Sequence, residues 1–162
     1  MMKRFFLILT LAVMSFAASA QVRSVGVSIG PFEGVSLQHW VYGTDDFFQL
    51  DLGYQVGVPM PGSMRMTATY NMILMQPEFT AEGVWNFYVG PGVQLGSGFR
   101  TLKALSLGAV CQVGLEYQFW FPLALSVEAR PNIGICISED RFKYDVDGLF
   151  GLIPTISAKY MF

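Results

Sequence analysis

The chain has 162 residues, which fits one domain. Only 14% of them are charged, against about 25% in an ordinary soluble domain, and the mean hydropathy is +0.43. Lys3 and Arg4 lie in a segment that we expect to be removed, which leaves 8 of the 10 basic residues against 12 acidic ones and a net charge of −4. This balance argues against a nucleic-acid partner, because no basic stripe is present to neutralise phosphates.

The first 20 residues have the pattern of a secretory signal peptide. "MMKR" is a basic start, "FFLILTLAVMSF" is an apolar run of roughly a dozen residues, and "AASA" is a small-residue cleavage site. The apolar run is shorter than the roughly 20 residues of a transmembrane helix. No cysteine follows the cleavage site, so we do not expect lipidation there. We therefore expect cleavage after Ala20 and an exported domain over residues 21–162.

After the signal, apolar and polar residues alternate with a period of two. In "FFQLDLGYQVGV" (47–58), Phe48, Leu50 and Leu52 alternate with Gln49 and Asp51. Successive side chains of a strand point to opposite faces, so each such segment has one apolar face. No helical spacing fits these segments, and no stretch reaches the roughly 18 consecutive apolar residues of a membrane helix. The sequence therefore predicts an all-β protein.

Turn signals divide the chain into eight expected strands. A barrel whose two ends both lie on the periplasmic side needs an even number of strands, which favours two strands over one bent strand in residues 25–41. We predict an antiparallel up-and-down transmembrane β-barrel, with "YGTDD", "QPEFTAE" and "FWFP" as periplasmic turns and "SEDRFKYDVD" (138–147) as the long outer connector. The expected strands are 23–30, 35–41, 47–58, 66–76, 83–97, 105–119, 121–137 and 148–162.

The polar set indicates which face is inside. A soluble lipocalin-like barrel keeps its apolar residues inside, and its outer surface would be about 25–35% charged. Here the polar set is mostly Gly, Ser, Thr, Gln and Asn, and small residues suit the crowded lumen of an eight-stranded barrel. We expect the apolar set to face lipid. Aromatic residues typical of a membrane interface gather near one rim: Tyr117, Phe119, Trp120, Phe121, Tyr160 and Phe162.

A few charged residues belong to the inward set. Glu128 and Arg130 share a face of one strand, and Glu116 lies on the neighbouring strand. They can form a binding or proton-handling cluster, or an ion-pair network that fills the lumen. We favour the network, because buried charges must be paired. The expected lumen polar cluster is Asp51, Glu116, Glu128, Arg130 and Lys159.

Enzyme and disulfide chemistry are alternatives that the alternation disfavours. Lipid-A-deacylating barrels use Ser, His and Glu, but Ser36 and the only histidine, His39, differ by an odd number and fall on opposite faces. Cys111 and Cys136 fall on opposite faces as well, which a disulfide does not tolerate. No metal cluster or phosphate loop is visible. We therefore expect no enzyme, metal or cofactor.

The chain ends in "ISAKYMF", which alternates up to the last residue. Most soluble domains fray at their ends, whereas a closed barrel must pair its last strand with its first. We expect Ile156, Tyr160 and Phe162 to face outward and Lys159 to lie inside.

A resemblance follows from "SIGPFEGVSLQHW", "GLEYQFWFPLALSVEARP" and "AKYMF". Over essentially its whole mature length the chain resembles the small eight-stranded outer-membrane barrels of Gram-negative bacteria, the OmpA/OmpX-type class. It is also similar to an outer-membrane β-barrel family common in Bacteroides-like bacteria. The resemblance implies a fold, an outer-membrane location and contact with its lipids and lipopolysaccharide. The ending resembles the signal read by the barrel-assembly machinery, carried here by Ile156, Tyr160 and Phe162.

The expected function is that of a monomeric outer-membrane barrel with a filled lumen, in a structural or surface-interaction role. A conduit or binder for small apolar molecules is the main alternative. A lipid-modifying enzyme and a soluble ligand-binding barrel are further ones.

Overall fold

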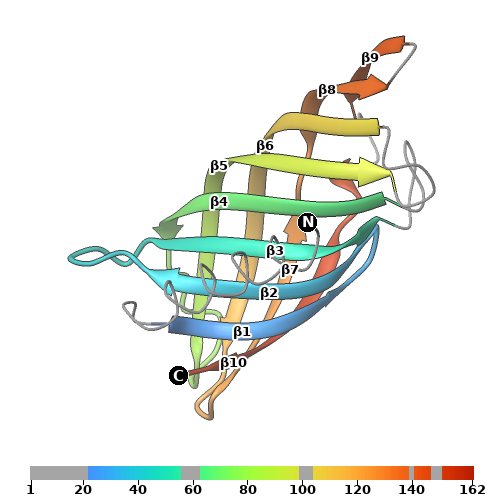
Figure 1. The fold of residues 1–162 in the computed structure, drawn as a ribbon. Coiled ribbons are helices and arrows are strands. Elements are labelled where there is room, and N and C mark those ends of the chain that lie inside the picture. The colour runs from blue at the N-terminus through green and yellow to red at the C-terminus, as the bar shows by residue number, and fades with distance from the viewer. Residues whose placement is uncertain (1–21, 56–62, 99–103, 139–140, 147–150) are drawn as a thin grey trace.

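The computed structural model describes residues 22–55, 63–98, 104–138, 141–146 and 151–162. Its strands form one antiparallel sheet (Figure 1). Within these ranges no helix is long and apolar enough to cross a membrane. The strands are β1 (Val22–Ile29), β2 (Phe32–Trp40), β3 (Phe47–Gln55), β4 (Ser63–Met75), β5 (Val84–Gly98), β6 (Ala104–Gln118), β7 (Leu123–Ala129), β8 (Asn132–Ser138), β9 (Arg141–Val146) and β10 (Thr155–Met161).

The sheet closes on itself. Each strand from β1 to β6 pairs with the next, β6 pairs with β7, β7 with β10, and β10 with β1. β7 and β8 pair with opposite halves of β6, so they form one long barrel strand that is interrupted at Arg130 and Pro131. Proline cannot donate to a ladder, which explains the interruption. The predicted eight-stranded antiparallel barrel is therefore confirmed.

Residues 25–41 are two strands, as the parity argument favoured. β1 and β2 form a hairpin that turns at Gly30 and Pro31. As a result β1 begins and β10 finishes at the same end of the barrel, together with the hairpins at 41–46, 76–83 and 119–122. We call this the terminal end, and the opposite end, where β1 turns into β2, the far end.

The prediction of one long connector at 138–147 is wrong in part. Residues 141–146 form β9, which pairs with β8 from Ser138↔Arg141 to Ile133↔Val146. Phe142, Tyr144 and Val146 alternate with charged residues, so this segment carries a strand period that its charges obscured. The β8–β9 hairpin projects beyond the neighbouring strands at the far end (Figure 1).

The last strand is shorter than predicted. β10 begins at Thr155, directly after Pro154, where the prediction began at 148. Residues 148–150 of that strand and 56–58 of the third lie outside the described residues.

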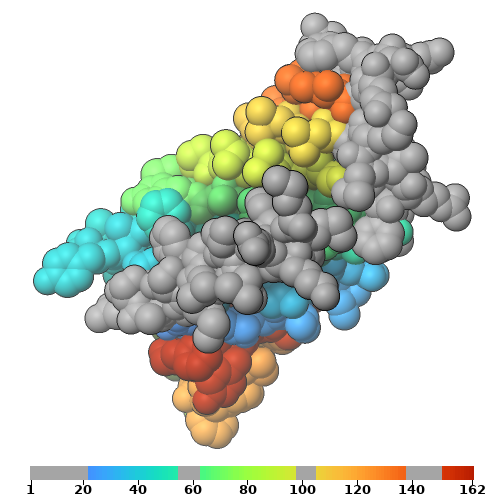
Figure 2. All heavy atoms as spheres, in the orientation of Figure 1, coloured from blue at the N-terminus to red at the C-terminus, as the bar shows by residue number. Residues whose placement is uncertain are grey.

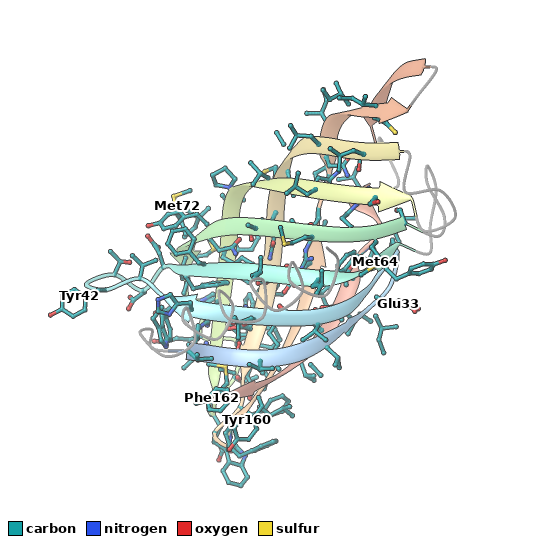
Figure 3. All side chains as sticks on the ribbon, viewed as in Figure 1. Glu33, Tyr42, Met64, Met72, Tyr160 and Phe162 are labelled. Atoms are coloured by element: carbon teal, nitrogen blue, oxygen red, sulfur yellow. The ribbon has the colours of Figure 1, made fainter. Side chains whose placement is uncertain are left out.

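The polarity of the barrel is inverted relative to a soluble protein. Apolar side chains cover the outer face: Val27 is 54% exposed and Ile133 is 64% exposed. Polar side chains such as Ser157 and Gln112 are fully buried inside. Figure 2 shows the outer wall running from β1 in blue through β4 in green to β6 in yellow, and Figure 3 shows Met64 and Met72 on it. The apolar set therefore points outward and the polar set inward, as predicted, and contact of the outer face with lipid stays a prediction.

Candidate functional site: the lumen network

The structure brings the five residues of the predicted lumen polar cluster together. Arg130 Nη1 lies 3.0 Å from Asp51 Oδ2, and Arg130 Nη2 also pairs with Glu128. Lys159 Nζ lies 2.5 Å from Glu128 Oε1 and 3.7 Å from Glu116 Oε2. These side chains come from β3, β6, β7, β10 and the break after β7, so the network ties both halves of the chain together across the lumen.

Glu128 is the centre of the network. Its carboxylate is fully buried and accepts hydrogen bonds on both oxygens. A buried carboxylate is tolerated when its partners satisfy its charge and its lone pairs, and these partners do so. The donors are Tyr88 Oη (2.8 Å), Ser126 Oγ (2.7 Å), Lys159 Nζ (2.5 Å), Gln49 Nε2 (3.1 Å), Gln112 Nε2 (3.3 Å) and Arg130 Nη2.

Arg23 is a member of the network that the sequence reasoning missed. Its Nη2 donates to Glu116 Oε1 at 2.5 Å and its Nη1 to Gln38 Oε1 at 2.8 Å. Simple alternation places Arg23 on the same outward face as Val25. The β1–β2 register shifts between Val22 and Ser24, and this irregularity turns Arg23 into the lumen.

Aromatic rings also fill the lumen, which the emphasis on small inward residues did not predict. Phe47 and Tyr88 are fully buried and meet edge to face, with ring centroids 5.0 Å apart. The Arg23 guanidinium carbon lies 4.1 Å from the Phe47 ring centroid, a cation–π contact. Gly114 makes room for Tyr88, because a Cβ at Gly114 would lie 2.3 Å from Tyr88 Cζ.

The residues considered for hydrolysis do not form a site. Ser36 is fully buried in the lumen, whereas His39, three residues later on β2, is partly exposed on the other face. A nucleophile and its base need hydrogen-bond reach. The part of the chain that the structure describes also holds no group of three or more His, Cys, Asp or Glu residues suited to a metal ion.

The two cysteines lie on opposite faces, as the alternation predicted. Cys111 is exposed on the outer face, and Cys136 pairs in register with the inward-facing Ser106. No disulfide joins the two, both of which lie in described strands.

The C-terminal strand forms the seam of the barrel. β10 pairs with β1 from Ile29↔Ile156 to Ser24↔Met161, and the Phe162 backbone N–H donates to the Arg23 carbonyl at 3.1 Å. Ile156, Tyr160 and Phe162 are exposed, whereas Lys159 is buried. Figure 3 shows Tyr160 and Phe162 near the end of the chain, pointing away from the barrel. Their role as an assembly signal remains a prediction.

Aromatic side chains form a band on the outer face at the terminal end. It begins at the β4–β5 hairpin and continues over β5 and β6 to the β6–β7 turn. Consecutive ring centroids are 5.6, 4.7, 4.6 and 5.0 Å apart along Phe79, Trp85, Tyr117, Phe119 and Phe121.

Comparison of the chain with protein-family models, curated proteins and solved structures finds no match.

Proposed function

We propose that this chain is an integral outer-membrane β-barrel protein of a Gram-negative bacterium, exported by a signal peptide that is cleaved after Ala20. Its role is structural or one of surface interaction, and it catalyses no reaction. The observation that carries the proposal is the inverted polarity: paired charges inside and an apolar surface outside. The proposed surroundings are outer-membrane lipids and lipopolysaccharide, with the barrel-assembly machinery as a partner during biogenesis and a monomer as the final state.

The outer face supports a lipid environment on energetic grounds. The largest apolar patch of a soluble monomer is typically about 300–600 Å². Here exposed apolar residues occur on every strand from β1 to β7, on β8 and on β10, and apolar surface in water costs about 25 cal/mol per Å². Acyl chains remove that cost. The strands of 13 to 15 residues in β4, β5 and β6 also exceed the roughly 9–11 residues that a tilted strand needs to cross a bilayer.

Two features of the outer face lie at opposite ends of the barrel, where the two surfaces of the proposed membrane would be. The aromatic band at the terminal end has the composition of an interfacial girdle. At the far end Glu33 points outward from β2, opposite Tyr54 of β3 (Figure 3). A charge on the lipid face is tolerated only near an interface. Between these edges the described outward side chains of β3 and β6 carry no formal charge.

The filled lumen supports a structural or surface role over a conduit. Arg23, Phe47, Tyr88 and Glu128 extend from β1, β3, β5 and β7 and contact one another in sequence across the interior. An apolar molecule passing this layer would have to separate buried ion pairs, which is strongly unfavourable. The β8–β9 hairpin, which projects at the far end, is the part best placed for a surface interaction.

The proposal is tested by expressing the full chain in a Gram-negative host and separating the membranes by density. We expect the protein in the outer-membrane fraction, resistant to alkaline carbonate and beginning at Gln21 by N-terminal sequencing. Unheated and heated samples should migrate differently in detergent gels, because a folded barrel stays compact. Recovery in the soluble periplasm without detergent would contradict the proposal. Uptake of small solutes by vesicles containing the barrel would favour the conduit instead.

A further inference from the structure

The β8–β9 hairpin at the far end carries a strand edge that no described strand covers. β9 lies beyond β10 in the same column of the barrel, because β7 pairs with β10 and β8, which continues β7, pairs with β9. The other neighbour of β10 is β1, which ends at Ile29, opposite Ile156, and turns back at Gly30 (Figure 1). Among the strands that the structure describes, β9 therefore pairs with β8 alone and stands at the end of the sheet order.

The free edge of β9 carries backbone groups that can accept one more strand. Two residues of the chain connect Ser138 to Arg141, which are in register, and the pair that flanks a two-residue connection is hydrogen-bonded. Hydrogen-bonded and non-hydrogen-bonded pairs alternate along an antiparallel ladder, so β8 takes the backbone groups of every second residue from Arg141. The residues between them have their N–H and C=O groups on the free side: Phe142, Tyr144 and Val146.

The charges along β9 select a second copy of the same strand as its partner. An antiparallel pair of identical strands has a two-fold axis at its centre, and the free backbone groups allow that centre at any residue from 142 to 146. With the centre at Tyr144, Lys143 of each copy stands opposite Asp145 of the other. Phe142 then stands opposite Val146, and both an opposite-charge pair and an aromatic–β-branched pair stabilise neighbouring strands.

The other centres are unfavourable. A centre at residue 142 sets Arg141 opposite Lys143, and centres at 143 or 145 set two lysines or two aspartates opposite each other. Like charges that stand directly opposite destabilise a strand pair. A centre at Val146 would pair only the last described residue of each strand. β9 is therefore complementary to itself in one register.

The direction of β9 determines where the second copy must lie. The free edge of β9 can pair with the same edge of another copy only if the two strands run antiparallel. The hairpin leaves the barrel at the far end (Figure 1), so two antiparallel hairpins belong to barrels whose far ends point toward each other. Barrels inserted in one membrane point the same way, whereas barrels in two facing membranes meet in the required orientation.

We propose that β9 is an adhesion strand, which pairs antiparallel with β9 of a second copy of this chain in a facing membrane. The inference gives a partner to the proposed surface-interaction role, and it rests on the proposed membrane location with the far end outside. Each barrel stays a monomer within its own membrane. A single pair of such short strands binds weakly, and many pairs formed at once between two membranes hold them together by avidity.

The test uses the full-length mature barrel in two populations of phosphatidylcholine vesicles. One population is immobilised through a biotinylated lipid, the other carries a lipid dye, and the captured dye is measured. We expect wild-type vesicles to capture each other. Lys143→Glu, or Asp145→Lys, in both populations should reduce capture by about tenfold or more, because each change turns two opposite-charge pairs into like-charge pairs. Glu33→Lys reverses a charge on β2, near the far end, and should leave capture unchanged.

A mixed experiment separates strand pairing from damage to the fold. Vesicles with Lys143→Glu should capture vesicles with Asp145→Lys, although neither captures its own kind, because opposite charges again face each other in the same register. Tyr144→Pro tests the backbone part of the pairing. It removes an N–H group from the free edge and leaves the ladder with β8 intact, so it should abolish capture.

Failure of wild-type vesicles to capture each other, or failure of the mixture to restore capture, would overturn the proposal. Equal capture of vesicles without the barrel would overturn it as well, since the hairpin would then bind lipid. The heat-dependent gel shift and the resistance to alkaline carbonate are measured on the same vesicles. If both are intact while capture fails, adhesion through β9 is refuted and the proposed membrane barrel stands. If the barrel does not enter the vesicles, both proposals are refuted.

Discussion

Lys159 Nζ lies 2.5 Å from Glu128 Oε1, and both side chains are fully buried in the lumen. Lys159 belongs to β10, the strand that closes the barrel against β1, and Glu128 is the centre of the lumen network. The seam of the barrel and the filling of its interior therefore depend on the same ion pair. A strand that failed to close would leave a buried carboxylate short of a cation.

Removing the charge of Glu128 should destabilise the barrel strongly. Glu128→Gln leaves Lys159 and Arg130 as buried cations without that carboxylate, which typically costs about 3–5 kcal/mol. Urea unfolding in detergent measures the free energy of unfolding. Glu33→Gln is the matched control on the outer face and should change this free energy by no more than about 0.5 kcal/mol. Equal effects of the two substitutions would refute the central role of the lumen pair.

Arg130→Ala should lower the temperature at which the barrel loses its heat-dependent gel shift. Arg130 pairs with Asp51 and Glu128, so its loss leaves two buried carboxylates with fewer partners. The shift is followed by gel electrophoresis over a temperature series. An unchanged transition temperature would count against an interior ion pair at this position.

Gly114→Ala tests the packing of the aromatic layer. The new methyl group would overlap the Tyr88 ring, which is held by Phe47 and by its hydrogen bond to Glu128. Overpacking of this kind costs about 1–3 kcal/mol in the free energy of unfolding. In a Tyr88→Ala background the same Gly114→Ala change should cost much less, because the ring is gone. A similar loss in both backgrounds would mean that the ring is not the obstacle.

Phe162→Ala should impair assembly of the barrel in cells. Phe162 is exposed at the end of the seam, in the position that the predicted assembly signal requires. Tyr42→Ala is the control, since Tyr42 is also an exposed aromatic residue and lies at the tip of the β2–β3 hairpin (Figure 3). The measurement is the fraction of protein that reaches the outer membrane in heat-modifiable form. If both variants assemble alike, the terminal aromatic residue carries no signal.

The alternation of residues was sufficient to predict the barrel. Long runs of period two and turn signals predicted the antiparallel strands and the inward direction of Asp51 and Lys159, and the parity argument was needed to reach eight strands. These features depend on local spacing, which the sequence contains directly.

Features that depend on breaks in the alternation were not predicted. The irregularity after Val22 reverses the face of Arg23, and Pro131 interrupts a run that otherwise alternates. The contacts of Arg23 with Phe47 and of Phe47 with Tyr88 depend on which residues meet across strands. That register is set by the whole barrel and leaves no local signal in any one segment.

Contact between the outer wall and acyl chains is tested most directly at Cys111, which lies midway along β6 on the outer face. In a Cys136→Ser variant this single thiol is labelled with an environment-sensitive fluorophore, and the barrel is placed in vesicles whose acyl chains carry bromine. A Tyr42→Cys label, in a background without Cys111, is the control at an exposed hairpin. We predict strong quenching of the Cys111 label by the brominated chains and none by aqueous iodide, with the reverse at position 42. Quenching of the Cys111 label by iodide and not by bromine would contradict a membrane-embedded barrel.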